Sequence, residues 1–437
     1  MTHLKQALKQ STGIAADVTE RVQEMLGAIA SGGEQTVRDL AAKLDGWEKD
    51  FIVSPDALDA LADSVDDQVK RDIEFAHQQV TAFTKAQRAS LSEFEIETRP
   101  GVRLGQRLVP VGCAGCYVPG GRFAHAASAI MSVATAKIAG VRKIIACTPP
   151  RGDSINPAVA YALRLSGADV VLAMGGVQAV ATMAHGLFTG TPADIIVGPG
   201  NAYVAEAKRL LFGKVGIDVV AGPTESLIVA DKTADPLFVA VDLVSQAEHG
   251  FDSAVGLVTD HEPLARRVLE LVPQVIQQLP IPDVAAVAWR DFGEVVLCAD
   301  RDEMREAADR YACEHTHVMA ADLEWWRDNL RNYGSLFLGE ECTVAYGDKT
   351  SGTNHILPTL GAARYSGGLN VMKFIKVLTW QQLDRTASLE IGAVTSRISR
   401  VEGMEAHARA ADLRLTTYHP GAKHDFEVFQ QPIANLK

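Results

Sequence analysis

The first hundred or so residues carry their apolar positions mainly at helical spacing. Residues 18–30 show this period and stop at Gly32-Gly33, and residues 66–91 form a long polar run with the pattern of one amphipathic helix. We therefore expect a helical amino-terminal segment.

From about residue 103 the pattern changes, because short runs of β-branched residues alternate with helical segments. Strands are predicted at 143–147, 169–173, 194–197, 226–230 and 254–258, with helices at 156–166, 177–185, 202–212 and 236–248. This alternation is typical of parallel sheets with helices on both faces. A second series begins near residue 226, which indicates two successive α/β units with a cleft between them.

The predicted fold class is α/β, with two Rossmann-like parallel-sheet domains, a helical amino-terminal segment and a small carboxy-terminal extension. After Gly367-Gly368 helical segments return up to about Leu413, and we expect this tail to make oligomer contacts. The expected boundaries are an arm at 1–23, a first α/β domain at 24–115 plus 225–370, a second at 116–224, and the extension at 371–437.

Composition makes some partners unexpected. The chain has 437 residues, enough for two or three domains, with a net charge of −12 and a pI near 5.5. An acidic chain gives no electrostatic reason to bind nucleic acid or an anionic membrane. No apolar run approaches the ~20 residues of a membrane span. The polar start MTHLKQALKQ lacks the apolar core of a signal peptide, so we expect a cytoplasmic protein.

Six cysteines are scattered along the chain, mostly among apolar residues, which favours buried reduced thiols. Cys113 and Cys116 have the spacing of a redox pair or of half a zinc site. No second cysteine pair completes such a site, so a structural role is the favoured interpretation.

Three glycine-rich turns precede predicted helices, where α/β proteins bind ligands. They are Pro119-Gly120-Gly121, Gly175-Gly176 and Gly198-Pro199-Gly200-Asn201. Glycine lets backbone amides approach a phosphate beside a helix amino terminus. Neither the G-x-G-x-x-G fingerprint nor the P-loop pattern is present, so each turn alone is better explained as a tight connection.

A polar segment closes the helix predicted at 236–248. Gln246 and His249 are three residues apart and share one face, where an amide oxygen and an imidazole could hold one zinc ion. Taken alone, these residues are better explained by a capped helix with a hydrogen-bonded histidine. Asp348, in the polar loop 347–355, is a candidate third ligand and His407 a fourth, although spacing alone nominates neither.

The segment Glu314-His315-Thr316-His317 places three ionisable side chains in an otherwise apolar stretch. Because imidazole titrates near neutral pH, an adjacent acid and imidazole form a natural general acid/base pair. A solvated helix end is the alternative interpretation.

In this order, these blocks resemble the histidinol dehydrogenase family over about residues 103–407. Each block alone is weak, whereas their joint occurrence is highly specific. The matching blocks are Tyr117-Val-Pro-Gly-Gly121, Gly175-Gly-Val-Gln178, Gly198-Pro-Gly-Asn201, Ala221-Gly-Pro-Thr-Glu225, Ser245-Gln-Ala-Glu-His-Gly250, Glu314-His315 and Ser351-Gly-Thr-Asn-His355.

The resemblance implies a homodimer with two sheet domains and one zinc ion. It also implies oxidation of a primary alcohol to a carboxylate through an aldehyde, with two NAD in turn. By matching position, the implied zinc ligands are Gln246, His249, Asp348 and, from the partner's carboxy-terminal extension, His407. The implied acid/base pair is Glu314 and His315, the NAD contacts are Tyr117, Gln178 and Asn201, and the substrate contacts are Thr224, in place of a more usual serine, and Glu402.

Some residues depart from the family pattern. They are Arg122 and His125 in a stretch that is usually small and apolar, Thr316-His317 where an aliphatic residue is usual, and Lys349 in the zinc-ligand loop. Arginine binds oxyanions well and would repel cationic histidinol. These features resemble the sulfopropanediol dehydrogenase branch. We therefore predict a small anionic alcohol, 2,3-dihydroxypropane-1-sulfonate, held by Arg122, His125 and His317, although these residues could also be surface or packing variants.

Three alternatives remain at this point. The nearest is histidinol dehydrogenase itself, which the departures disfavour. A zinc hydrolase would use the metal and Glu314 without a nucleotide, against the glycine turns and the NAD-contact matches. A non-enzymatic solute-binding protein would more often carry a signal peptide.

Overall fold

The computed structural model describes residues 1–9, 16–120, 124–219 and 222–429. The chain divides into two compact units. The large unit comprises Met1–Ser90 and Pro110–Ile375, and the small unit comprises Leu91–Val109 and Lys376–Lys437.

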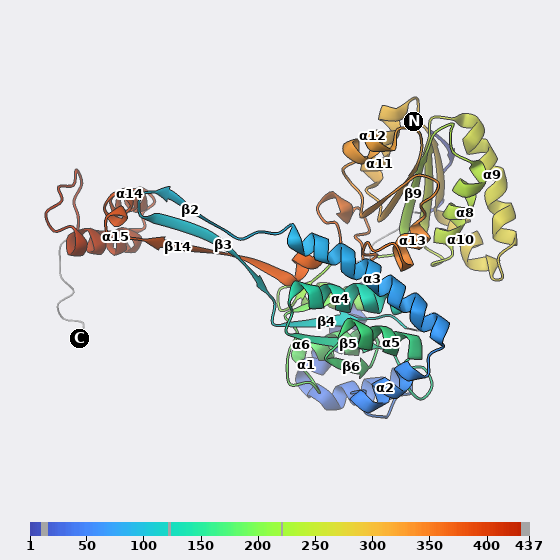
Figure 1. Ribbon diagram of the computed structural model, residues 1–437, viewed down its shortest axis with the longest axis horizontal. Coiled ribbons are helices and arrows are strands. Elements are labelled where there is room, and N and C mark those ends of the chain that lie inside the picture. Colours follow the sequence, from blue (N-terminus) through green and yellow to red (C-terminus); the bar gives the residue numbers. More distant parts are fainter. Residues whose placement is uncertain (10–15, 121–123, 220–221, 430–437) are drawn as a thin grey trace. The chain divides into compact units, whose positions relative to one another are not determined.

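A six-stranded sheet forms part of the large unit (Figure 1). Its order is β1-β11-β10-β9-β12-β13, and all neighbours are parallel except β1, which is antiparallel to β11. The strands are β1 (Thr2–Lys5), β9 (Glu225–Ala230), β10 (Ala254–Thr259), β11 (Gly293–Leu297), β12 (His315–Met319) and β13 (Ser335–Leu338). The sequence ESLIVA of β9 is buried after its first residue, as a parallel strand covered on both faces requires.

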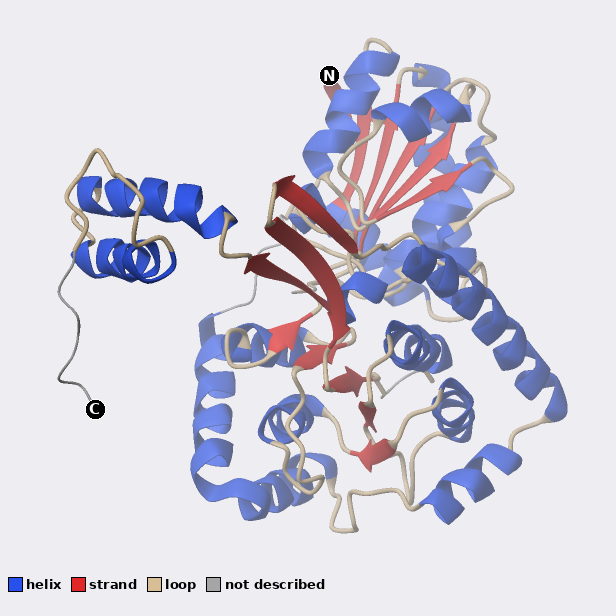
Figure 2. Ribbon diagram, turned by 60° about the vertical axis from the view of Figure 1, so that its left-hand side comes forward, coloured by secondary structure: helices blue, strands red, loops and turns tan. Residues whose placement is uncertain are grey.

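Helices cover both faces of this sheet (Figure 2). Two apolar clusters form its core, one beneath helices α8 to α10 and one beneath α11 and α12. The helices are α8 (Pro236–Ala247), α9 (Glu262–Gln277), α10 (Pro282–Phe292), α11 (Arg301–Tyr311) and α12 (Leu323–Asn329), followed by the short α13 (Val344–Lys349). Two 3₁₀ turns, Ala362–Arg364 and Val371–Phe374, end the large unit.

A five-stranded parallel sheet with the order β6-β5-β4-β7-β8 also belongs to the large unit. Its strands are β4 (Cys113–Tyr117), β5 (Lys143–Thr148), β6 (Val170–Ala173), β7 (Ile195–Val197) and β8 (Gly216–Ile217). Its helices are α1 (Ala16–Asp45), α2 (Pro55–Asp63), α3 (Asp67–Ala89), α4 (Ala126–Ala139), α5 (Pro157–Ser166), α6 (Gly176–His185) and α7 (Ala202–Leu211). Contacts join α1 to α6 and α7, α2 to α5, and α3 to α4 and α5.

A buried ion pair holds the turn between β7 and α7. Asp218 Oδ2 accepts a hydrogen bond from the Gly198 N–H at 2.7 Å, and Lys208 Nζ donates to the Gly198 carbonyl at 2.8 Å. Lys208 also contacts Asp218, and both side chains are almost completely buried. Asn201 then caps α7 by accepting from Tyr203 N–H at 3.1 Å. Both ends of this glycine-rich turn are thus fixed.

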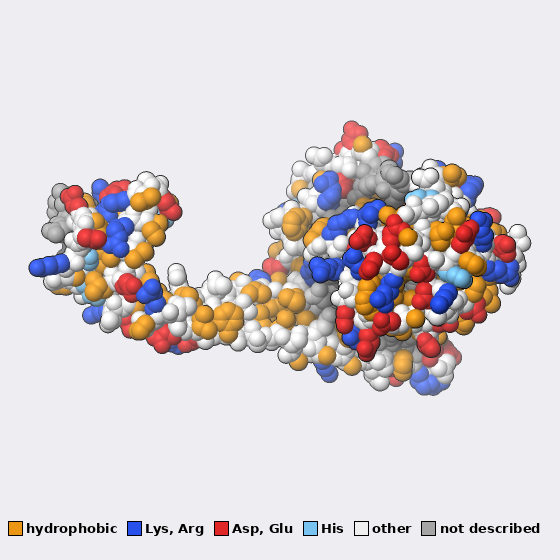
Figure 3. All heavy atoms as spheres, turned by 90° about the horizontal axis from the view of Figure 1, so that it is seen from above, with side chains coloured by type: hydrophobic (Ala, Val, Ile, Leu, Met, Phe, Trp, Pro, Cys, Tyr) orange, Lys and Arg blue, Asp and Glu red, His pale blue; other side chains and the backbone are white. Residues whose placement is uncertain are grey.

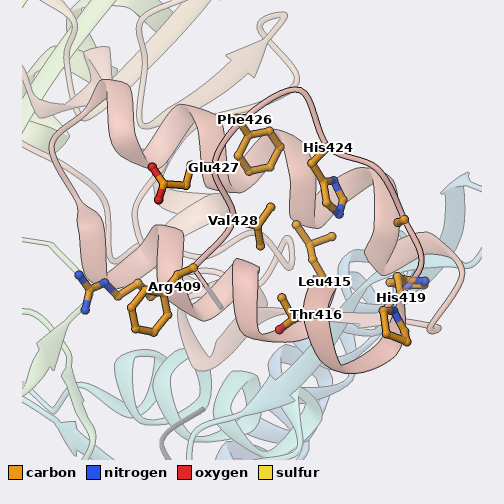
Figure 4. A pocket seen from close by; sticks show the side chains of 11 residues that line it. Arg409, Leu415, Thr416, His419, His424, Phe426, Glu427 and Val428 are labelled. Carbon is orange, nitrogen blue, oxygen red and sulfur yellow. The ribbon is translucent and has the colours of Figure 1, made fainter. Parts of the chain in front are cut away.

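The small unit contains a three-stranded sheet of order β14-β3-β2 and two helices. Its elements are β2 (Phe94–Arg99), β3 (Val102–Pro110), β14 (Ile375–Leu383), α14 (Ala387–Val401) and α15 (Glu405–Tyr418). A pocket of about 1070 Å³ lies beside α15, with Arg409, His419 and His424 among its lining residues (Figure 4). None of the predicted site residues lines it.

The expectation of a mixed α/β fold with parallel sheets is confirmed. Within the stretch expected to be helical, however, strands occur at Thr2–Lys5 and Phe94–Arg99. The expected partition groups residues 24–115 with 225–370, whereas α1 to α3 make contacts with the helices of the five-stranded sheet. The domain boundaries themselves stay a prediction.

The surface charges, the cysteines and the lengths of the helices bear on what the composition led us to expect. Acidic and basic side chains are interspersed over the visible face of the large unit (Figure 3). Five of the six cysteines are buried free thiols, and burial raises the pKa of Cys113 to about 11. Within the described ranges, every helix is too short or too polar to cross a membrane.

Candidate active site

Glu314 and His315 lie at the amino end of β12, between β9 and β13. Their side chains are buried, and His315 Nδ1 lies 3.6 Å from Glu314 Oε2. The Glu225 N–H donates to the same carboxylate oxygen at 3.1 Å. Burial raises the pKa of Glu314 to about 7, against the opposing effect of His315. This carboxyl group can therefore exchange a proton near neutral pH.

Asp348, in the last turn of α13, lies near Nε2, the second ring nitrogen of His315. His315 Nε2 lies 3.7 Å from Asp348 Oδ1, and His249 Nε2 lies 3.8 Å from Asp348 Oδ2. Burial alone would raise the pKa of Asp348, but the neighbouring histidines, His315 foremost, lower it to about 2. For His315, burial is likewise outweighed by Glu314 and Asp348, which raise its pKa. The structure thus brings together two histidines and two carboxylates.

Gln246 lies at the end of α8, three residues before His249. It is 2% exposed, and its Oε1 atom is buried without a hydrogen-bond partner among the described residues. An unpaired buried oxygen is costly unless a ligand satisfies it. Burial lowers the pKa of His249, which favours the neutral imidazole that binds metals. The amide, imidazole and carboxylate of Gln246, His249 and Asp348 are a donor set that suits zinc.

These donors do not form a complete metal cage in one chain. Among the described residues, no three His, Cys, Asp or Glu side chains are arranged to hold a metal ion. His407, the fourth predicted donor, is exposed on α15 in the small unit, where it lines an apolar groove of about 530 Å³. Glu402 is the exposed C-cap of α14 in the same unit.

His355 connects the Asp348 helix to α4. Its Nδ1 lies 2.9 Å from the carbonyl oxygen of Asp348, and its Nε2 lies 2.8 Å from Ser128 Oγ. Burial lowers the pKa of His355 to about 4, so its ring is neutral near pH 7. Because a carbonyl only accepts, Nδ1 carries the proton and Nε2 accepts from the Ser128 hydroxyl.

Basic side chains lie beside Asp348, among them Lys349 and the imidazole of His125. His125 is the N-cap residue of α4, and its pKa is lowered by burial and then by the charges of Lys349 and His249. Arg122 lies outside the described residues. Thr224 directly precedes β9, and its carbonyl accepts from the Ala254 N–H at 3.1 Å.

The predicted NAD contacts lie at the carboxyl ends of strands in the five-stranded sheet. Tyr117 closes β4, and its hydroxyl accepts from the Gly176 N–H at 3.1 Å, at the start of α6. Gln178 donates through Nε2 to Asp45 Oδ2 at 2.7 Å, while its Oε1 is buried without a partner in the described structure. Asn201 caps α7. The acid/base pair, by contrast, lies at the amino end of its strand.

His317 occupies a different environment from the one predicted. The side chain is fully buried, with Nε2 2.8 Å from the Gly339 carbonyl and Nδ1 3.2 Å from Asp242 Oδ2. Nε2 therefore has a protein acceptor, and Nδ1 lies next to a carboxylate without making a hydrogen bond to it. We accordingly leave His317 out of the proposed substrate contacts.

Sequence reasoning assigned no role to Ser128, His355 or Asp45. His355 lies in a block that supported the resemblance, so a signal existed for it. Ser128 and Asp45 carry no such signal, because they become significant only through partners that lie 227 and 133 residues away.

Known proteins of one family are similar to this protein over nearly the whole chain. Residues 8–415 match the histidinol dehydrogenase family. The chain is 55% identical to sulfopropanediol 3-dehydrogenase of Ruegeria pomeroyi over 97% of its own length and 98% of that protein's. It is 56% identical to a histidinol dehydrogenase homolog of the same organism, over 93% and 94% of the two chains.

A solved structure supports the fold. The crystal structure of histidinol dehydrogenase from Elizabethkingia anophelis is similar with a TM-score of 0.88 at 33% sequence identity. The similarity covers 94% of this chain and 95% of that one.

Proposed function

Since the chain belongs to the histidinol dehydrogenase family, we propose that it is a zinc- and NAD-dependent enzyme that oxidises 2,3-dihydroxypropane-1-sulfonate to 3-sulfolactate. As a member of this family it is a dehydrogenase that catalyses the four-electron oxidation of an alcohol through an aldehyde. The observation that carries the proposal is the buried Glu314–His315 pair beside Asp348, His249 and the unpaired oxygen of Gln246.

Gln246, His249 and Asp348 of one subunit, with His407 of the partner subunit, would hold the zinc ion. When bound, zinc orients and polarises the substrate oxygen. This assignment makes the enzyme a homodimer in which the extension at 371–437 completes the partner's active site. The exposed position of His407 leaves its imidazole available for such a contact.

Tyr117, Gln178 and Asn201 would contact NAD, which accepts one hydride in each of the two oxidations. The buried, unpaired Oε1 of Gln178 beside the turn at Gly176 supports a polar ligand there. A Cβ at Gly198 would lie 2.0 Å from the Tyr117 carbonyl oxygen, so only glycine fits this turn. These features support a cofactor at the carboxyl edge of the five-stranded sheet.

His315 would accept the hydroxyl proton of the alcohol during the first oxidation. Its contacts with Glu314 and Asp348 stabilise the resulting imidazolium. Glu314 would then take a proton from the water that adds to the aldehyde. The hydrated aldehyde loses its second hydride and becomes the carboxylate. In total two hydrides leave the carbon. The first oxidation releases one proton, and the second, which consumes one water and ends in the carboxylate, releases two.

The groups beside Asp348 support an anionic substrate. His125 and Lys349 lie close enough for the charge of Lys349 to lower the pKa of His125. We assign Arg122, His125 and Thr224 to the substrate, together with Glu402 by matching position. Histidinol, which is cationic, would be repelled by the guanidinium of Arg122. The similarity to sulfopropanediol 3-dehydrogenase supports the same choice.

Two binding measurements test this proposal before any assay of turnover. The purified protein should contain about one zinc per subunit and should bind NAD in a titration. A zinc hydrolase would contain the metal without binding NAD, and a solute-binding protein would contain neither. Replacement Arg122→Ala should raise the KM for the sulfonate strongly, and an unchanged KM would remove Arg122 from the pocket.

A further inference from the structure

A buried polar cluster lies beside the acid/base pair and uses none of the side chains assigned to the reaction. Its centre is His317, the third residue of β12. Its two ring nitrogens face Gly339 and Asp242, as described above. Because a carbonyl oxygen only accepts hydrogen bonds, Nε2 donates to Gly339, while Nδ1 lies 3.2 Å from Asp242 Oδ2 without the geometry of a hydrogen bond.

Asp242 connects this histidine to two further elements. It lies on α8, one turn before Gln246, and its Oδ1 accepts a hydrogen bond from Thr343 Oγ1 at 3.2 Å. Thr343 is the N-cap residue of α13, the helix that carries Asp348. One carboxylate therefore joins α8 to the strand of the acid/base pair and to the start of α13.

Phe337 on β13 packs against the same cluster. Its ring centroid lies 6.2 Å from that of His317 and 6.0 Å from that of His315. Gly347 closes the other side, because a Cβ there would lie 2.5 Å from Phe337 Cε1. The packing is thus continuous from His317 through Phe337 to His315 and to the residue before Asp348.

We propose that His317 and Asp242 are positioning residues that fasten α8, β12 and α13 so that Gln246, His315 and Asp348 converge. The identity of the converging groups rests on the proposed function, whereas the fastening of the three elements does not. His317 is fully buried, with Nε2 against Gly339 and Nδ1 against the Asp242 carboxylate, so its ring is placed between structural elements and not at a surface open to substrate.

The test uses the full-length protein in three variants. His317→Leu removes both ring nitrogens. His317→Asn keeps an N–H group near the position of Nδ1, toward Asp242. Tyr311→Phe is the matched control, because it removes a hydrogen bond from α11 to Glu294 on β11 of the same sheet, away from the cluster.

The first readout is hydrogen–deuterium exchange of the metal-free protein. His317→Leu should speed exchange in residues 242–249 and 343–349, His317→Asn should restore much of the protection in 242–249, and the control should leave both segments unchanged. Exchange at wild-type rates in both segments of His317→Leu would overturn the proposal, and so would an increase spread evenly over the sheet.

The second readout is zinc release to a competing chelator. Residues that orient metal ligands typically change metal affinity by about 10–100-fold. Release should therefore be at least about tenfold faster from His317→Leu and near the wild-type rate from Tyr311→Phe. Equal rates in these two variants would overturn the role in positioning the metal ligands. If the wild-type protein binds no zinc, the proposed function fails, and the exchange readout still decides whether the cluster fastens the three elements.

Discussion

Glu314 and His315 are neighbours in sequence whose side chains also meet in space, since His315 Nδ1 lies 3.6 Å from Glu314 Oε2. Consecutive residues of a regular strand point to opposite faces of the sheet. Glu314 lies just before β12, so its side chain is not bound to the face opposite that of His315. The two side chains can therefore meet in a buried site. An acid and an imidazole are thereby held within reach of one substrate.

Replacing Glu314 with Gln should separate the two oxidations. The amide keeps an oxygen for the Glu225 N–H but cannot take a proton from water. We expect the first oxidation to survive and the aldehyde oxidation to fall by about 10²–10⁴-fold. NADH formed per alcohol should drop from about two toward one. Full retention of the second oxidation would show that another group activates water.

The pH dependence of aldehyde oxidation gives a second test of the role of Glu314. Burial raises the pKa of Glu314 to about 7, and only the carboxylate form can act as a base. Oxidation of the supplied aldehyde should therefore rise as pH increases through about 7 and decline below it. The Glu314→Gln variant should lack this limb of the profile. An identical limb in both proteins would assign it to a different group.

Gly198→Ala should impair NAD binding much more than Gly213→Ala. Both glycines have positive φ, at 123° and 100°, so alanine is strained at either position. Only at Gly198 would the new Cβ meet backbone, 2.0 Å from the Tyr117 carbonyl oxygen, whereas nothing lies within 4 Å of the Cβ at Gly213. A titration with NAD on both folded variants measures the difference. Equal affinities would remove this turn from the cofactor site.

Asp218→Asn should destabilise the large unit. It leaves the buried ammonium of Lys208 without its ionic partner, and breaking a buried pair typically costs about 3–5 kcal/mol. The companion variant Lys214→Met removes an exposed lysine from the same region and should change stability by no more than about 0.5 kcal/mol. Urea unfolding followed by circular dichroism compares the two. If Asp218→Asn lost as little stability as Lys214→Met, the ammonium of Lys208 would have to be hydrated by water in the variant.

The alternating strands and helices between residues 143 and 258 could be read from the sequence closely. Parallel strands covered on both faces appear as short β-branched runs, and side-chain caps such as Asn156 and Asn201 mark where helices begin. Strands β1 and β2 were not predicted. β1 has only four residues, and β2 is exposed along its whole length, so neither shows the apolar run of a buried strand.

Some residues of the candidate site could likewise be predicted from the sequence, and others could not. Glu314, His315, Gln246 and His249 could be nominated because their spacing is local. The partners of His317 could not, because Asp242 and Gly339 lie 75 and 22 residues away in the chain and only the folded sheet brings them to its ring. His317 was predicted as a substrate contact from its place beside Glu314 and His315, whereas its burial and the Gly339 contact of its Nε2 are features that only the folded chain shows.

The central claim is best tested by measuring NADH formation by the zinc-loaded protein with NAD and either 2,3-dihydroxypropane-1-sulfonate or histidinol. The account predicts about two NADH per sulfonate molecule and no turnover of histidinol, as expected for a four-electron oxidation in an anion-binding pocket. Turnover of histidinol alone would contradict the account and would show that Arg122 and His125 do not select an anionic substrate.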